Sequence, residues 1–156
     1  MKWIFKYLKG TSKHGILFAR QHGDNSVVGY VDVDNASNVD DSKLTTSYIF
    51  TLLGLPIYWR YTLQSVIDMS TTEVKYMVVA EVAKEAPWLK RIVKELGSNQ
   101  CRVQLHCDNH SVIYLAKHLV YLAVRFHKIR ELIVTKEIFL KNVHTLENVG
   151  VMLQIY

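Results

Sequence analysis

The order of apolar and polar residues predicts a strand-rich first half followed by alternating helices and strands. Runs rich in β-branched and aromatic residues predict strands at 15–20, 26–32, 46–53, 57–62, 102–107 and 137–143, with a further extended segment at 64–69. Gly54, Leu55 and Pro56 form a turn signal between the third and fourth strands, so we expect an antiparallel hairpin there. This order of elements predicts one mixed sheet covered by helices.

Helical periodicity falls between these strands. We expect a short helix at 1–9, the longest helix at 70–96, and helices at 111–117 and 124–134, with weak helical turns at 147–154. The first helix places Trp3, Ile4, Tyr7 and Leu8 on one face. The longest helix has a capping box, Ser70 with Glu73, at its start and Gly97 as its stop. Pro87 lies inside it, at an expected cost of roughly 3 kcal/mol and usually with a kink.

An apolar stripe follows one face of the longest helix and should face the sheet. Lys75 is at the head of this stripe, and a charge in that position needs a partner. We expect a salt bridge from Lys75 to a nearby aspartate. Glu73 points to another face and is expected to be a solvent-facing cap. The apolar members of the stripe are Val79, Val82, Ala86, Leu89, Val93 and Leu96.

Composition narrows the functional classes only modestly. Hydrophobic residues make up 49% of the 156 residues, which is enough for a real core, and the net charge of +5 suits a polyanionic partner without identifying one. No apolar run approaches the length of a membrane span, and the N-terminus lacks a signal-peptide core, so we expect an intracellular protein. Cys101 and Cys107 are expected to be incidental or buried thiols, because the seven histidines and two cysteines show no metal-ligand spacing.

Two aspartates stand where buried strands end. Asp32 follows the apolar run 27–31, and Asp108 follows the strand 103–107. Carboxylates at the ends of neighbouring strands can converge on one divalent cation, since hard oxygen ligands suit Mg²⁺. Both can equally be ordinary strand-end residues. Asp34 lies on the same strand face as Asp32 and is expected to be a solvated turn residue rather than a ligand.

A series of motifs then resembles the RNase H domain of a Ty1/copia-type retrotransposon Pol polyprotein, in a degenerate copy. The resemblance covers nearly the whole chain, and its motifs occur in the family's order. They are YLKGT at 7–11, GYVDVD at 29–34, STTEVKY at 70–76, KEAPWL at 84–89, CDNHS at 107–111, LAK at 115–117, FHKIREL at 126–132 and VHT at 143–145.

The resemblance implies an α/β RNase H-like fold with a mixed five-stranded sheet flanked by helices. It also implies two domains: residues 1–25 as a helix and strand from the connection to a preceding reverse transcriptase, and residues 26–156 as the RNase H-like domain. The implied ancestral activity is hydrolysis of the RNA strand of an RNA/DNA hybrid by two Mg²⁺ ions held by four carboxylates. An RNA/DNA hybrid or other nucleic acid is the expected partner. We expect no membrane and no small-molecule substrate, and the oligomeric state stays open.

The carboxylates of this family are carried over position by position. Asp32 matches the first and Asp108 the third, whereas Lys75 stands at the second and Val151 at the fourth. The four positions then carry a net formal charge of −1 instead of −4, and two Mg²⁺ ions would lack ligands. Pro87 and a segment missing between Ala123 and Val124 are further departures from the family.

We therefore expect a vestigial metal site and an inactive enzyme. The alternatives are a weak nuclease that uses Asp34, a non-catalytic module that binds nucleic acid or protein, and a transposon remnant without function. Tyr58, Trp59 and Tyr61 could stack on nucleic acid bases, but strand residues in an apolar context are expected to be core. The basic surface formed by Lys84, Lys90, Arg91 and Lys94 is expected to be a mixed solvated face.

Overall fold

Five strands form one mixed sheet in the computed structural model, which describes residues 2–15, 26–35, 43–65, 71–97, 102–118 and 127–154. They are β1 (Val27–Asn35), β2 (Lys43–Leu52), β3 (Leu55–Ser65), β4 (Val103–Cys107) and β5 (Ile138–Asn142), in the order β3-β2-β1-β4-β5. The pairs β1–β2 and β2–β3 are antiparallel, whereas β1–β4 and β4–β5 are parallel. The mixed five-stranded sheet expected from the sequence is confirmed.

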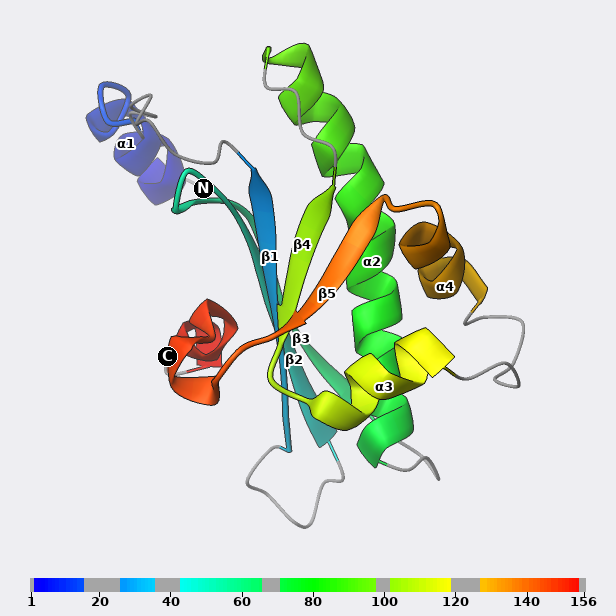
Figure 1. Cartoon of the computed structure of the whole chain (residues 1–156). Helices are drawn as coiled ribbons and strands as arrows, with labels where there is room; N and C mark the ends of the chain where they lie inside the picture. The colour runs from blue at the N-terminus through cyan, green and yellow to red at the C-terminus, as the bar shows by residue number, and fades with distance from the viewer. Residues whose placement is uncertain are drawn as a thin grey trace.

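The helices lie on both sides of this sheet. They are α1 (Lys2–Gly10), α2 (Thr71–Glu95), α3 (His110–His118), α4 (His127–Val134) and the 3₁₀ helices η2 (Thr145–Glu147) and η3 (Val149–Gln154). Figure 1 shows α2, α3 and α4 on one face of the sheet and the C-terminal 3₁₀ segment on the other. We call these the helix face and the open face. The helices expected from periodicity are all present, and the strand expected at 15–20 lies, apart from Gly15, outside the described residues.

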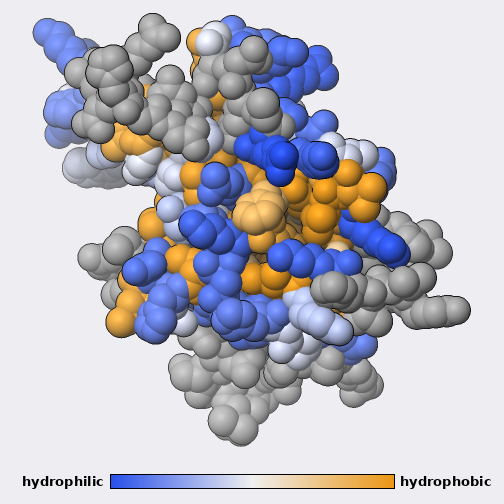
Figure 2. Space-filling model, viewed as in Figure 1, coloured by the Kyte–Doolittle hydropathy of each residue, from blue (hydrophilic) through white to orange (hydrophobic). Residues whose placement is uncertain are grey.

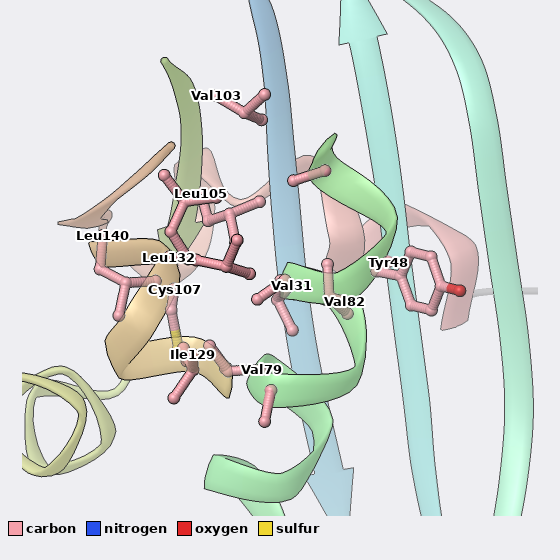
Figure 3. Close-up of a cluster of buried hydrophobic side chains, with 14 of the residues drawn as sticks. Val31, Tyr48, Val79, Val82, Val103, Leu105, Cys107, Ile129, Leu132 and Leu140 are labelled. Carbon is pink, nitrogen blue, oxygen red and sulfur yellow. The ribbon is translucent and has the colours of Figure 1, made fainter. Parts of the chain in front are cut away.

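The core lies between α2 and the helix face. Val31, Leu105 and Val82 are fully buried there, and Figure 3 shows side chains of the strands, α2 and α4 directed toward one another. The predicted stripe of α2 is buried at Val79, Val82, Ala86, Leu89 and Val93. Leu96 was wrongly included, because it is 76% exposed. In Figure 1 the C-terminal end of α2 extends beyond the sheet, which leaves this position without a surface to pack on.

The hairpin β2–β3 is confirmed, but its turn lies earlier than expected. Leu53 and Gly54 form a two-residue connection in which both φ angles are positive, 55° and 77°. This backbone matches the twist of an antiparallel pair. Pro56 belongs to β3 and pairs with Thr51 instead of ending the turn. A proline is tolerated there because β3 is an edge strand, where a backbone N–H is not required on the outer side.

The end of α2 agrees with the sequence, and its start lies outside the described residues at Ser70. Gly97 has a φ of 87°, and its N–H donates to the carbonyl of Lys94 at 3.0 Å, which closes the last turn. The helix is continuous from Thr71 to Glu95 through Pro87. Packing of the buried stripe therefore outweighs the hydrogen bond that the proline removes.

The helix α1 forms as expected but buries none of its residues. Its apolar face is open to solvent, since Trp3 is 79% and Tyr7 68% exposed. Residues 1–25 thus contribute no described side chain to the core, and their assignment to a separate connecting unit stays a prediction. None of the described helices has the length and apolar character needed to cross a membrane.

Gly29 marks the closest packing between the sheet and its cover. A Cβ atom at this position would lie 2.6 Å from Leu105 Cδ2 and 2.8 Å from Phe50 Cε1, both on the helix face. Neither neighbour is at the end of a loose surface chain, because both side chains are fully buried. A side chain at this position would therefore displace the core.

We expect the substitution Gly29→Ala to lower the free energy of unfolding by about 1–3 kcal/mol, because it overpacks a filled core. Urea denaturation followed by circular dichroism measures this change. Gly10→Ala is the matched control: nothing lies within 4 Å of the added carbon, so its unfolding midpoint should be unchanged. Equal unfolding midpoints for both variants would contradict the prediction, because they would mean that β1 can move to accommodate the added carbon.

Candidate functional site at the carboxyl ends of β1 and β4

The parallel pairing of β1 with β4 brings the two predicted aspartates to one edge of the sheet. Val31 pairs with Cys107 at the end of the ladder, and Asp32 and Asp108 are the next residue of each chain segment. Neighbouring strands lie about 4.8 Å apart, so the two backbones are adjacent at this point. The structure therefore confirms the expected convergence of the two strand ends.

Asp32 is buried on the open face beneath η3, with 7% of its surface exposed. Residues alternate along β1, so that Val31 faces the helix side and Asp32 the opposite side. The approach of η3 is close: a Cβ atom at Gly150 would lie 3.2 Å from Asp32 Cβ and 3.4 Å from its backbone nitrogen. Only glycine fits at position 150 without a shift of η3 or β1.

Three hydrogen bonds hold η3 against β1 and β2. Ser47 Oγ donates to the carbonyl of Gly150 at 2.9 Å, and both groups are buried. Asn148 Nδ2 donates to the carbonyl of Val31 at 3.0 Å, while Asn148 Oδ1 accepts from the N–H of Gly150 at 3.1 Å. The side chain of Asn148 is itself 3% exposed. One amide thus fixes both the strand and the 3₁₀ helix beside Asp32.

Asp108 is partly buried and is linked to the segment after β5. Thr145 Oγ1 donates to Asp108 Oδ2 at 3.3 Å, and the N–H of Val143 donates to the carbonyl of Cys107 at 3.2 Å. Asn109 follows directly and accepts the N–H of Val112 at 3.1 Å, which caps the start of α3. The β4–α3 connection is therefore held on both sides of Asp108.

Lys75 belongs to α2, and its charge acts on the buried thiol of Cys107, as do the charges of Asp32 and Asp108. Burial raises the pKa of the Cys107 thiol to about 11. The charges of Asp108 and Asp32 also raise this pKa, whereas a backbone hydrogen bond from Asn109 and the charge of Lys75 lower it. All three charged side chains therefore act on one buried sulfur. That Lys75 occupies the place of the family's second carboxylate stays a prediction. A salt bridge from Lys75 to either aspartate stays a prediction.

Val151 follows Gly150 in η3 and is partly buried. Because Gly150 packs closely on Asp32, the backbone of position 151 lies near Asp32, and the assignment of Val151 to the fourth carboxylate position stays a prediction. The side chain of Asp34 lies outside the described residues, so its role as a ligand stays a prediction. Among the residues that the structure describes, no group of three or more histidine, cysteine, aspartate or glutamate side chains is arranged to hold a metal ion.

Sequence reasoning missed the residues that position the site. Ser47, Thr145 and Asn148 each donate a hydrogen bond that fixes a neighbour of the two aspartates. Their partners are distant in sequence, since Ser47 and Gly150 are 103 residues apart. The one available signal was Asn148 with Gly150 in a short segment, which favours a tight backbone arrangement.

The chain is similar in sequence to polyproteins of transposons. It is 38% identical over 98% of its length to the retrovirus-related Pol polyprotein from transposon TNT 1-94 of Nicotiana tabacum, and 34% identical over 83% to that from transposon RE1 of Arabidopsis thaliana. It spans only 12% and 9% of these two relatives. It is also 37% identical over 57% of its length to the secreted RxLR effector protein 161 of Plasmopara viticola, of which it spans 62%.

Solved structures agree on the fold at low sequence identity. RNase H1 from Halobacterium salinarum has a TM-score of 0.56 at 12% identity, over 80% of this chain and 90% of that one. LC11-RNase H1 from compost has a TM-score of 0.58 at 12% identity, over 83% and 92%. Prototype foamy virus protease–reverse transcriptase has a TM-score of 0.56 at 11% identity, over 87% of this chain and 20% of that one. No protein-family model matches the chain.

The clamp formed by Asn148 should be measurable on its own. We expect Asn148→Ala to lower the free energy of unfolding by about 2 kcal/mol or more, because it leaves the Val31 carbonyl and the Gly150 N–H buried without partners. Amide hydrogen exchange at Gly150 should also accelerate. Asn142→Ala removes the same group from an exposed position of β5 and should change neither quantity. Unchanged exchange at Gly150 in the first variant would contradict the clamp.

Proposed function

This chain is an RNase H-like domain related to a segment of the retrovirus-related Pol polyproteins of transposons, and from that premise we propose that it binds RNA/DNA hybrids without cutting them efficiently. The ancestral reaction is Mg²⁺-dependent hydrolysis of the RNA strand. Two of the four carboxylates that the family uses for it are replaced by Lys75 and Val151. The proposal concerns the domain alone, since the chain spans about a tenth of its transposon relatives.

One observation supports the proposed loss of catalysis: Lys75 and Val151 stand at two of the four positions where the related family has carboxylates. A divalent cation needs several oxygen ligands and a negative site. Here the ammonium group of Lys75 supplies positive charge where the family has its second carboxylate, and the side chain of Val151 supplies no ligand. The residues present therefore do not fit a pair of Mg²⁺ ions.

What remains at this edge can hold nucleic acid rather than cut it. Thr145 Oγ1 donates to Asp108 Oδ2 at 3.3 Å, and a salt bridge from Lys75 to either aspartate would reduce the repulsion of a phosphate by the carboxylates. The whole chain carries a net charge of +5, which favours a polyanion through counterion release. These features support binding of a hybrid with a marked dependence on salt.

We expect the natural chain to leave a labelled RNA/DNA hybrid uncut in Mg²⁺ and to retain it in a salt-dependent binding assay. The double variant Lys75→Glu/Val151→Asp should gain Mg²⁺-dependent cleavage, because it restores both missing carboxylates. Denaturing gel electrophoresis of the labelled RNA strand measures the product.

Asp32→Asn in the double-variant background is the matched control and should abolish the regained cleavage. Cleavage by the natural chain that disappears with Asp32→Asn would refute the proposal and show that Asp32 works with other ligands. A double variant that folds and binds the hybrid but does not cut would show that the two substitutions are not the cause of inactivity.

Metal affinity gives a readout that is independent of catalysis. We expect the thermal unfolding midpoint of the natural chain to be insensitive to millimolar Mg²⁺ or Mn²⁺. The Lys75→Glu/Val151→Asp variant should unfold at a lower temperature without metal, because like charges are brought together, and should gain several degrees when Mn²⁺ is added. Differential scanning calorimetry measures both shifts. A metal-dependent stabilisation of the natural chain of equal size would contradict the replaced site.

A further inference from the structure

The positive charge of the chain is concentrated in its N-terminal segment. Residues 1–23 contain five basic residues and no carboxylate, because the first acidic residue of the sequence is Asp24. The whole chain has 19 basic and 14 acidic residues, so the part that begins at Asp24 has 14 of each and is formally neutral. The net charge of +5 therefore belongs entirely to the segment before Asp24. Its basic residues are Lys2, Lys6, Lys9, Lys13 and Arg20.

The helix α1 gathers three of these cations on one face. Lys2, Lys6 and Lys9 fall within an arc of about 60° around the helix axis, and all three are exposed. Ile4 and Leu8 lie on the opposite face. Figure 2 shows hydrophilic residues that project from α1 at the upper left, with apolar residues beside them. We call the three lysines the lysine face.

Cations elsewhere in the fold have carboxylate partners. The basic surface of α2 is the mixed surface that the sequence predicted, because its cations alternate with glutamates and form ion pairs. Along α1 no carboxylate can play this part. Like charges at i and i+4 destabilise an isolated helix, so the lysine face does not serve the stability of α1 itself. The ion pairs of the fold include Arg60–Glu81 at 3.3 Å, Lys90–Glu137 at 2.6 Å and Arg91–Glu95 at 3.8 Å.

The exposed aromatic residues of β3 do not provide a second cationic surface. Trp59 is 58% and Tyr61 is 53% exposed, whereas Tyr58 packs against the core. The expectation of a core role is confirmed for Tyr58 and wrong for Trp59 and Tyr61, because alternate residues of a strand face opposite sides of the sheet. Arg60 lies between the two exposed rings in sequence, but it faces α2 and is paired there with a glutamate.

We propose that the lysine face of α1 holds the phosphate backbone of a bound nucleic acid. This inference rests on the proposed function and names the part of the chain that makes the contact. Lys2 and Lys9 are seven residues apart, which is about 10 Å along a helix. One strand of a duplex advances about 3.4 Å per phosphate, so the lysine face spans about three phosphates. Each lysine then neutralises one phosphate and releases its counterion.

The direction of the lysine face favours nucleic acid over an anionic lipid surface. The apolar face of α1 is exposed, with Ile4 at 63% and Leu8 at 55%, and such a face can lie in a lipid interface. In that orientation the lysine face would point away from the headgroups, because it is opposite to the apolar face. A phosphate backbone can lie directly on the lysines. It does not use the apolar face, so the two faces can be tested separately.

The test uses the full chain and a fluorescein-labelled RNA/DNA hybrid without divalent metal, with fluorescence anisotropy at several salt concentrations. We expect Lys2→Gln/Lys6→Gln/Lys9→Gln to weaken binding about tenfold or more and to reduce the salt slope by about 2–3, because three phosphate contacts are lost. Glutamine has a helix propensity similar to that of lysine, and α1 buries no residue, so the unfolding midpoint should stay unchanged. Lys2→Arg/Lys6→Arg/Lys9→Arg keeps the charges and should bind as the natural chain does.

Two variants are the matched controls. Lys84→Gln/Arg91→Gln/Lys94→Gln removes three positive charges from exposed positions of α2 and should keep most of the affinity for the hybrid. It changes the net charge by the same amount, so it separates a local contact from a general effect of charge. Ile4→Ala/Leu8→Ala alters the apolar face of α1 and should bind the hybrid as the natural chain does.

The remaining outcomes each overturn a defined part. Hybrid binding that is unchanged in the lysine-to-glutamine variant of α1, or that is weakened equally in the α2 variant, refutes the lysine face and leaves the proposed function standing. A natural chain that does not bind the hybrid refutes the proposed function and this inference together. Sedimentation with vesicles of phosphatidylserine and phosphatidylcholine that is lost in Ile4→Ala/Leu8→Ala, without hybrid binding, assigns α1 to a lipid surface and refutes the inference.

Discussion

The parallel pairing of β1 with β4 is the constraint on which the rest of the site depends. Because Val31 is paired with Cys107, the residues that follow them leave the sheet at the same edge. The pairing is held from both sides. Gly29 has no room for a side chain against Leu105, and a side chain at Gly150 would press closely on Asp32. A shift of one residue in this register would move Asp32 from the open face to the helix face, away from η3.

The proposed replacement of two carboxylates would change the chemistry of the edge without changing its architecture. Lys75 is carried by the first turns of α2, whose buried stripe is set by Val79 and Val82. Val151 is carried by η3, which Asn148 and Ser47 hold in place. The backbone therefore presents both positions regardless of which side chain they bear. An RNase H-like fold can persist after its metal ligands are lost, because its stability comes from apolar packing and from the clamp on η3.

Much of the fold was predictable because its elements have strong local signals. The stripe of α2, the stop at Gly97 and the five described strands followed from periodicity and turn residues. The errors fall where the decisive partner is remote. Leu96 continues the periodic pattern but passes beyond the sheet, and the turn at Leu53 and Gly54 precedes the proline that seemed to mark it. Trp59 and Tyr61 have strand propensity, which does not say which face of the sheet is covered.

The sequence by itself determined most element types and the family relationship, since these depend on local patterns and on motifs in order, and it supplied the proposal for the four positions at the site. Only the tertiary structure decided which groups support that site and which surfaces stay open. Ser47 reaches Gly150, and Asn148 reaches Val31, across more than a hundred residues of chain. Trp59 lies in solvent because no described helix covers its side of β3. Such contacts depend on how layers stack, and no local pattern encodes a distance between segments that meet only after folding.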